Sequence, residues 1–163
     1  MTQYNARELK APTLESVSDA ALKFLIGNRV MTSAALAIGT TATNVATGAF
    51  AYMVDGIIKS KTAVAAGTAF TDATPQPAGT SAMYLLAIDA AGSITIINGE
   101  AVPLSENVGQ PDDLRVPACP LDHAPLGAVK VETTAEFVPG TTALSAGTVT
   151  DTYYNFGVAV RSA

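Results

Sequence analysis

The sequence predicts a mainly β protein: an antiparallel β-sandwich or barrel, jelly-roll-like, preceded by a short N-terminal arm and helix. Three observations favour this fold. Many short runs have strand-like composition, turns rich in Gly, Pro and Asp separate these runs, and helical periodicity is confined to the first 29 residues. A chain of 163 residues is long enough for one domain with its own core. We therefore expect an anchor over residues 1–29 and a β domain over residues 30–163.

The composition is poor in charge. Charged residues make up 14% of the chain, against about 25% in typical soluble domains, while hydrophobic residues reach 48%. No run approaches the ~20 apolar residues of a membrane-spanning helix, so we expect no membrane partner. The net charge is −5 and basic residues do not cluster, which argues against nucleic-acid binding. A surface with so little charge is typical of a protein that lives in an assembly, and we expect a homotrimer.

The first element in the chain is the predicted anchor. Residues 1–12 have no periodicity and indicate an extended arm, whereas residues 16–19 have the form of a helix capping box. A helix from there places four apolar residues on one stripe, and Gly27 can end it. The stripe consists of Val17, Ala21, Phe24 and Leu25. About ten residues are too few for a stable isolated helix, so the stripe needs a partner surface, either the β domain or another protein.

The strongest local signal is Asp55-Gly56 within residues 49–62, which predicts a two-residue hairpin turn. A turn there fixes the register of the two strands. One face then pairs Val54 with Ile57, Tyr52 with Lys59 and Phe50 with Lys61, and the other pairs Met53 with Ile58, Ala51 with Ser60 and Ala49 with Thr62.

Further strands are expected on both sides of this hairpin. Before it we expect residues 31–38, with Ala34, Leu36 and Ile38 on one face, and a short strand around Val45. After it we expect strands at 64–70, 82–88, 93–97, 126–133 and 152–160. In the last strand, Tyr154, Phe156, Val158 and Val160 are predicted to share a face. Turns are expected at 89–92, 98–99 and 139–140, with a proline-containing loop at 74–79 and an irregular, proline-rich connection at 100–125.

Residues that could carry chemistry are few. Cys119 is the only cysteine and His123 the only histidine, with Asp122 beside them and Asp112 and Asp113 a few residues earlier. Zinc sites generally use three or four such ligands at set spacings, and a catalytic nucleophile needs an adjacent base. We therefore expect no metal, no cofactor and no enzyme activity.

Four tyrosines offer an alternative reading as a sugar-binding surface: Tyr52, Tyr84, Tyr153 and Tyr154. They are scattered over several predicted strands and the chain has no Trp, so packing in the core or between subunits is the favoured interpretation.

The order of several segments resembles small structural proteins of tailed bacteriophages, described as decoration, cement or head-fibre proteins. The resemblance is carried by residues 32–39, 50–58, 84–92, 117–131, 137–141 and 150–152, and it covers most of the chain from residue 32 onward. It implies a virion component, commonly trimeric, and it transfers no catalytic residue.

The resemblance leads to a function. We expect a non-catalytic protein that decorates or cements the phage capsid, binds the major capsid protein or another virion protein through its N-terminal segment, and is made in the bacterial cytoplasm. The alternative is a head- or tail-fibre domain that binds host-surface glycans.

Overall fold

The computed structural model describes residues 27–104 and 115–157. These residues contain eleven strands and no helix, and the strands form three antiparallel sheets that do not close into a barrel. The prediction of a mainly β, sandwich-like fold is confirmed, whereas the barrel alternative is wrong for this part of the chain. The predicted arm and helix lie outside the described residues.

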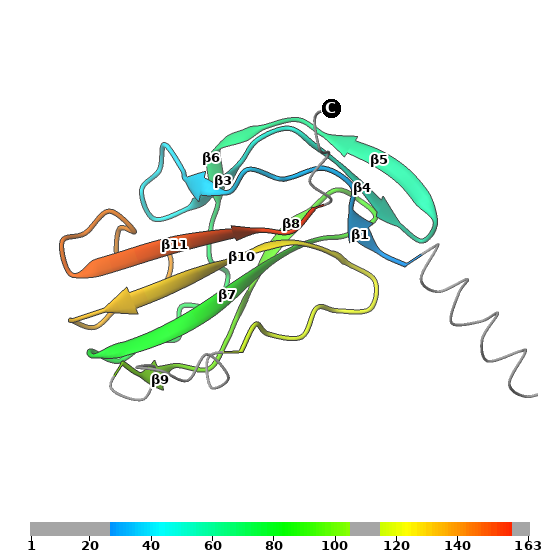
Figure 1. Ribbon diagram of the computed structural model, residues 1–163. Helices are drawn as coiled ribbons and strands as arrows, with labels where there is room; N and C mark the ends of the chain where they lie inside the picture. Colours follow the sequence, from blue (N-terminus) through cyan, green and yellow to red (C-terminus); the bar gives the residue numbers. More distant parts are fainter. Residues whose placement is uncertain (1–26, 105–114, 158–163) are drawn as a thin grey trace, which may run out of the picture.

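Two of the sheets are halves of one long ribbon. Strands β4 (Phe50–Val54) and β5 (Ile57–Lys61) pair in the register that the Asp55-Gly56 turn predicts, from Val54 opposite Ile57 to Phe50 opposite Lys61. The predicted Ala49–Thr62 pair falls just beyond these strands. Strands β3 (Val45–Thr47) and β6 (Val64–Thr68) then continue the same ribbon, with Thr47 opposite Val64. Figure 1 shows this ribbon arching along one side of the larger sheet.

The hairpin turn has the backbone that its sequence requires. Asp55 has φ of 53° and Gly56 has φ of 74°, so both central residues are left-handed, as in a type I′ turn. Asp tolerates this region better than most residues and Gly adopts it without steric cost. The turn type therefore follows directly from the Asp-Gly pair.

The larger sheet has the order β11-β10-β7-β8, and β9 also pairs with β7. Its strands are β7 (Thr80–Ile88), β8 (Ile94–Asn98), β9 (Val102–Pro103), β10 (Ala124–Thr133) and β11 (Val149–Asn155). All nine residues of β7 are buried, so this strand is covered on both faces. Figure 1 shows β7, β10 and β11 running side by side through the middle of the domain.

The core lies between the ribbon and the larger sheet. β7 contributes Tyr84, Leu86 and Ile88 from one face, and Ile96 of β8, opposite Leu86, belongs to the same core. Val129 and Val131 of β10 are fully buried, while Lys130 between them is partly exposed, so this strand alternates between the core and solvent. Other large members of this core are Phe50, Tyr52, Val54, Phe70, Leu126, Phe137 and Leu144.

The predicted strand at residues 31–38 is wrong for most of its length. The structure has β1 (Arg29–Val30) and β2 (Ala37–Ile38), with irregular backbone between them. Ala35 has φ of 47°, which a strand cannot accommodate, and the Leu36 amide donates to Asn155 Oδ1 at 2.8 Å. Single hydrogen bonds to Ala51, Gly48 and Asn155 therefore replace a sheet ladder here. Of the three residues predicted to share a face, Ala34 and Leu36 are buried, whereas Ile38 is 36% exposed.

The last predicted strand is also partly wrong. β11 begins three residues earlier than expected and ends at Asn155, and its inward side chain is Tyr153, while Tyr154 is 43% exposed. Phe156 still packs against the core because it lies beyond the strand, where its amide donates to Leu126 O. The predicted shared face of Tyr154 and Phe156 is therefore wrong, because Tyr154 is in the strand and Phe156 follows its end. Val158 and Val160 lie outside the described residues.

Three smaller differences concern element ends. β6 stops at Thr68, so Phe70 reaches the core from a loop. β7 starts two residues before the predicted strand. The predicted turn at Asn98-Gly99 is instead a continuation of strand pairing, because Gly99 N donates to Met83 O at 2.8 Å.

Candidate functional site

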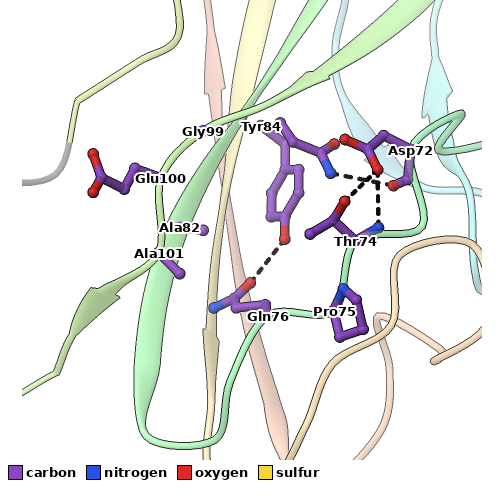
Figure 2. A pocket seen from close by; sticks show the side chains of 10 residues that line it. Asp72, Thr74, Pro75, Gln76, Ala82, Tyr84, Gly99, Glu100 and Ala101 are labelled. Atoms are coloured by element: carbon purple, nitrogen blue, oxygen red, sulfur yellow. Dashed lines mark hydrogen bonds between the residues drawn. The ribbon is translucent and has the colours of Figure 1, made fainter.

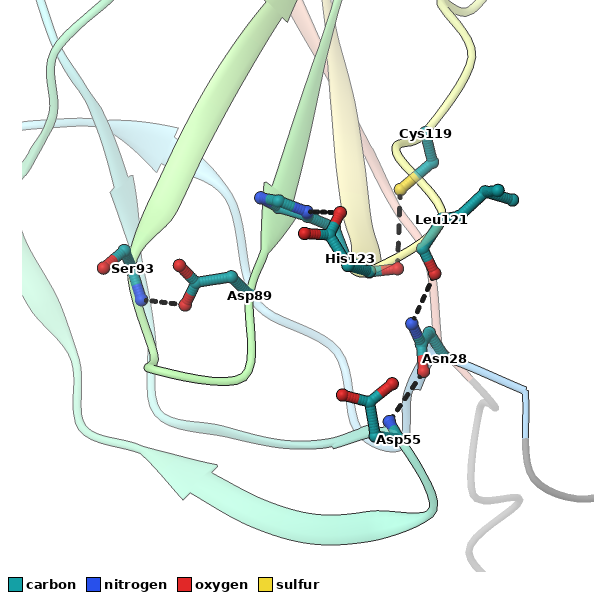
Figure 3. Close-up of polar contacts among 8 residues, drawn as sticks. Asn28, Asp55, Asp89, Ser93, Cys119, Leu121 and His123 are labelled. Atoms are coloured by element: carbon teal, nitrogen blue, oxygen red, sulfur yellow. Dashed lines mark hydrogen bonds and ion pairs between the residues drawn. The ribbon is translucent and has the colours of Figure 1, made fainter.

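One end of the domain brings three separate segments together around Asn28. Asn28 Oδ1 accepts a hydrogen bond from Asp55 N in the hairpin turn, and Asn28 Nδ2 donates to Leu121 O in the loop before β10, each at 2.8 Å. Figure 3 shows this bridge between the start of β1, the turn and the loop. A single side chain thus fixes where the described chain begins relative to the hairpin.

The same end carries exposed apolar side chains. Ile57, Ile58 and Leu121 are 58%, 64% and 98% exposed, more than any other large hydrophobic residue in the described part of the chain. Single exposed apolar residues are ordinary, and Ile57 and Ile58 lie on opposite faces of the hairpin, so these three are separate exposed side chains near the turn rather than one continuous surface. We call Ile57, Ile58 and Leu121 the tip patch.

The edge of β5 is chemically different from its tip. Within the described residues β5 pairs only with β4, so its other edge is open. Lys59 Nζ and Lys61 Nζ donate to Ala90 O and Gly92 O in the β7–β8 turn, which holds the ribbon against the larger sheet. Lysines on an edge strand also oppose pairing with a like-charged strand. The lysines therefore disfavour pairing of another strand with the open edge of β5, whereas no charged residue belongs to the tip patch.

A polar pocket of about 390 Å³ is lined by residues 72–76, by Ala82 and Tyr84 of β7, and by residues 98–101. Its floor is the buried Gln76, whose Oε1 accepts from the Tyr84 hydroxyl at 2.9 Å and whose Nε2 donates to Thr80 O and Val131 O. Figure 2 shows the Tyr84–Gln76 hydrogen bond, with Glu100 directed away from it. Because the Gln76 amide has partners at both its oxygen and its nitrogen, this network joins the 74–79 loop to β7 and β10.

Two titratable groups that line this pocket, Tyr84 and Asp72, have shifted pKa values. Burial, and then the nearby Asp72 carboxylate, raise the pKa of Tyr84. Hydrogen bonds from the Thr74 side chain and backbone lower the pKa of Asp72, which is fully exposed to solvent. The pocket thus holds a neutral phenol and an ionised carboxylate, and neither is poised to exchange a proton near neutral pH.

The Cys119–His123 loop is compact but makes no reactive pair. The Cys119 thiol donates to the backbone oxygen of His123 at 3.7 Å, while His123 Nδ1 lies 2.7 Å from Asp122 Oδ1. Burial, and then the Asp122 carboxylate, raise the pKa of Cys119, which disfavours the nucleophilic thiolate. Within residues 27–104 and 115–157, no three His, Cys, Asp or Glu side chains gather so as to hold a metal ion. Asp112 and Asp113 lie outside these residues.

The structure does not bring the four tyrosines together. Tyr52 and Tyr84 are each 2% exposed and belong to the core, and Tyr153 packs against that core from β11. Tyr154 is exposed on the opposite face of the same strand. The favoured interpretation, packing, is confirmed for Tyr52 and Tyr84.

The predicted anchor residues Val17, Ala21, Phe24 and Leu25 lie outside the described residues. Sequence reasoning missed the tip patch. Ile57 and Ile58 were assigned to strand faces, and nothing in the sequence shows that both stay uncovered. Leu121 fell in the irregular connection, where no periodicity gives an orientation.

Comparisons with known proteins leave the family open. The chain matches no protein-family model, no curated protein and no solved structure. In the part of the chain that the structure describes, no helix is long and apolar enough to cross a membrane.

Proposed function

We propose that this protein is a non-catalytic structural component of a tailed-phage virion, which decorates or cements the capsid and is anchored by its N-terminal segment. The sequence resemblance described above supports this role. Its partners on the particle would be the major capsid protein or another virion protein, together with further copies of the chain in a homotrimer.

One structural observation carries the anchoring part of the proposal. The residues from Val30 to Phe156 build a continuous core among themselves, and the chain before Gly27 departs from the end that carries the tip patch. A domain that has its own core can hold a particle through a separate segment. Burying four apolar side chains could then supply several kcal/mol at about 25 cal/mol per Å², and the effect is multiplied by many sites on a shell.

The test is a chain that starts at Asn28. We expect it to fold, with the circular dichroism of the full chain, but to stay in the supernatant when capsids assembled without this protein are sedimented. The full-length chain should sediment with those capsids. Replacing Phe24 and Leu25 by Ser should weaken sedimentation without a large fall in melting temperature. The matched control is Ile26→Ser, which changes an apolar residue on the opposite side of the predicted helix.

Three results would contradict the proposal in different ways. If the shortened chain unfolds, the N-terminal segment belongs to the core of the domain. If it folds and still sediments with capsids, the anchor lies elsewhere, for instance in the 102–125 connection. If the full-length chain never sediments with capsids, the virion role itself is wrong. Light scattering should give three times 16.6 kDa for the proposed trimer.

A further inference from the structure

One edge of the larger sheet is open. β11 is the last strand of that sheet, and within the described residues it pairs only with β10. The strands packed against this sheet contact other members of it, since β1 and β4 contact β10 and β6 contacts β8. At the opposite end of the sheet, Asn98 of β8 also donates from Nδ2 to Asp72 O in a neighbouring loop. The edge of β11 is therefore the less protected of the two.

The unpaired backbone groups of β11 follow from its ladder. Thr134 N donates to Thr148 O at 2.9 Å, one step beyond the end of the β10–β11 register. Hydrogen-bonded and non-hydrogen-bonded pairs alternate along an antiparallel ladder, so the even-numbered residues of β11 bond to β10. The amides and carbonyls of Asp151 and Tyr153 consequently point away from β10, toward the open edge.

The side chains along this edge carry little charge. Among the residues Val149–Asn155, only Asp151 is charged. The outer face presents Thr150, Thr152 and Tyr154, all exposed. Edge strands are usually protected by charged side chains, Pro or bulges, as the two lysines protect β5. The outer face of β11 has none of these, so the strand is suited to accept another strand.

A second copy of β11 matches this edge. Two antiparallel copies related by a two-fold axis at Thr152 set Thr152 opposite Thr152, and Thr150 of each copy opposite Tyr154 of the other. Thr–Thr pairs and aromatic–β-branched pairs stabilise neighbouring strands. In the same register Asp151 lies opposite the uncharged Tyr153, and the outward amides and carbonyls of these two residues can exchange hydrogen bonds in both directions.

Charge selects this register and this strand. An axis at Asp151 would set the two Asp151 carboxylates opposite each other, and like charges directly opposite are destabilising. The open edge of β5 meets the same obstacle. An axis at Ser60 would set Lys59 of one copy opposite Lys61 of the other, and an axis at Lys59 would set Lys59 opposite itself.

We propose that β11 pairs antiparallel with β11 of a second copy about a two-fold axis at Thr152, so that the larger sheets of two copies form one continuous sheet. The pairing uses only the β domain and does not rest on the virion role. One short strand per copy offers less than the ~1,200–2,000 Å² of a stable interface, so pairing strengthens with concentration. It is distinct from the three-fold contact of the proposed trimer, and it joins either two single chains or two trimers.

Disulfide trapping in the full-length protein tests the position of the axis. In a Cys119→Ser background, Thr152→Cys brings two thiols together across the axis. The Cα atoms of such a non-hydrogen-bonded pair lie about 4.5 Å apart, within the range of a disulfide. Thr150→Cys is the matched control. It is exposed on the same face, but its equivalent in the other copy lies four positions away, or about 13 Å at ~3.3 Å per residue.

We expect mild oxidation to give at least tenfold more covalent dimer for Thr152→Cys than for Thr150→Cys. Adding Tyr154→Cys to Thr150→Cys should restore the dimer, because these two positions face each other in the proposed register. Equal yields for the two single variants, or no dimer for Thr152→Cys, would overturn the proposal.

Sedimentation equilibrium measures the pairing in chains without added cysteines. Thr152→Lys would set two ammonium groups opposite each other, and it should lower the average mass at high concentration toward half that of the wild type, whether the pairing unit is one chain or a trimer. Thr141→Lys, at an exposed threonine in a turn, is the control of equal charge and should keep the wild-type mass. A wild-type mass that does not rise with concentration, or equal masses for the two variants, would contradict the pairing. Sedimentation with capsids tests the anchor separately, so either proposal can fail without the other.

Discussion

The buried Gln76 network makes a quantitative prediction about stability. Gln76 is 3% exposed, and its amide joins the Tyr84 hydroxyl to the carbonyl oxygens of Thr80 and Val131. Gln76→Leu keeps a similar volume but leaves these three groups without that partner. An unsatisfied buried polar group costs about 1–3 kcal/mol, and backbone carbonyls that keep other partners cost less, so we expect a total loss of about 3–5 kcal/mol.

Tyr84→Phe should cost less, about 1–2 kcal/mol, because it leaves only Gln76 Oε1 without a partner. The double variant is the decisive measurement. Once Gln76 is replaced, the Tyr84 hydroxyl is already unpaired, so removing it should cost little or even stabilise the protein. The two single losses should therefore exceed the loss in the double variant by about 1–2 kcal/mol.

Urea unfolding followed by circular dichroism measures all four chains of this cycle. For a protein of this size, 1 kcal/mol corresponds to about 2–4 °C in melting temperature, so Gln76→Leu should melt roughly 6–20 °C lower than the wild type. Tyr154→Phe, at an exposed tyrosine, is the control and should be within about 0.5 kcal/mol of the wild type. Additive losses, within about 0.5 kcal/mol, would refute the coupling of Gln76 and Tyr84.

Two further predictions concern pH and backbone geometry. Burial raises the pKa of Tyr84 and of Tyr153 above the ordinary 10.0, so the folded state keeps phenolic protons that the unfolded state loses. The contribution of these two tyrosines is therefore complete below pH 10 and should fall above it by at most about 1.4 kcal/mol per pH unit for each. The fall should be shallower in Tyr84→Phe, as urea midpoints from pH 9 to 11 can show. Gly127→Ala would place Cβ 2.4 Å from Tyr154 O and should disrupt β10–β11 pairing, whereas Gly56→Ala meets no atom within 4 Å and should cost only about 1–2 kcal/mol for its positive φ; similar denaturation midpoints for the two variants would contradict this.

Local chemistry explains what could be predicted from the sequence. The β4–β5 hairpin was predicted residue by residue because an Asp-Gly pair permits few turn types, and a two-residue turn leaves one register. The turn at residues 89–92 followed for the same reason, since Gly92 takes the left-handed position and Asp89 accepts from Ser93 N. The alternation of Val129 and Val131 with Lys130 likewise indicates which face of β10 is buried. These features depend on contacts close in sequence.

The errors occur where distant segments override local pattern. Residues 31–36 have the alternation of a strand, but their hydrogen bonds go to scattered partners: Met31 and Thr32 bond to Ala51, Ala34 O accepts from Gly48 N, and the Leu36 amide donates to Asn155 Oδ1. Two observations explain the course of β11. Its register with β10 is unbroken from Thr133 opposite Val149 to Gly127 opposite Asn155, and Gly127 lets the Tyr154 backbone come close. A period-2 pattern gives alternation along a strand, but it does not say where the ladder stops.

Some features of the candidate site can likewise be predicted from the sequence, and others depend on the tertiary structure. Composition alone shows that chemistry-bearing side chains are scarce, and helical spacing predicts the apolar stripe of Val17, Ala21, Phe24 and Leu25. Only the tertiary structure decided that Asn28 joins the hairpin turn to the loop at Leu121, and that Ile57, Ile58 and Leu121 remain exposed at that end. The physical reason is that exposure depends on which segments cover a side chain, and Leu121 is separated from Asp55 by 66 positions in the sequence.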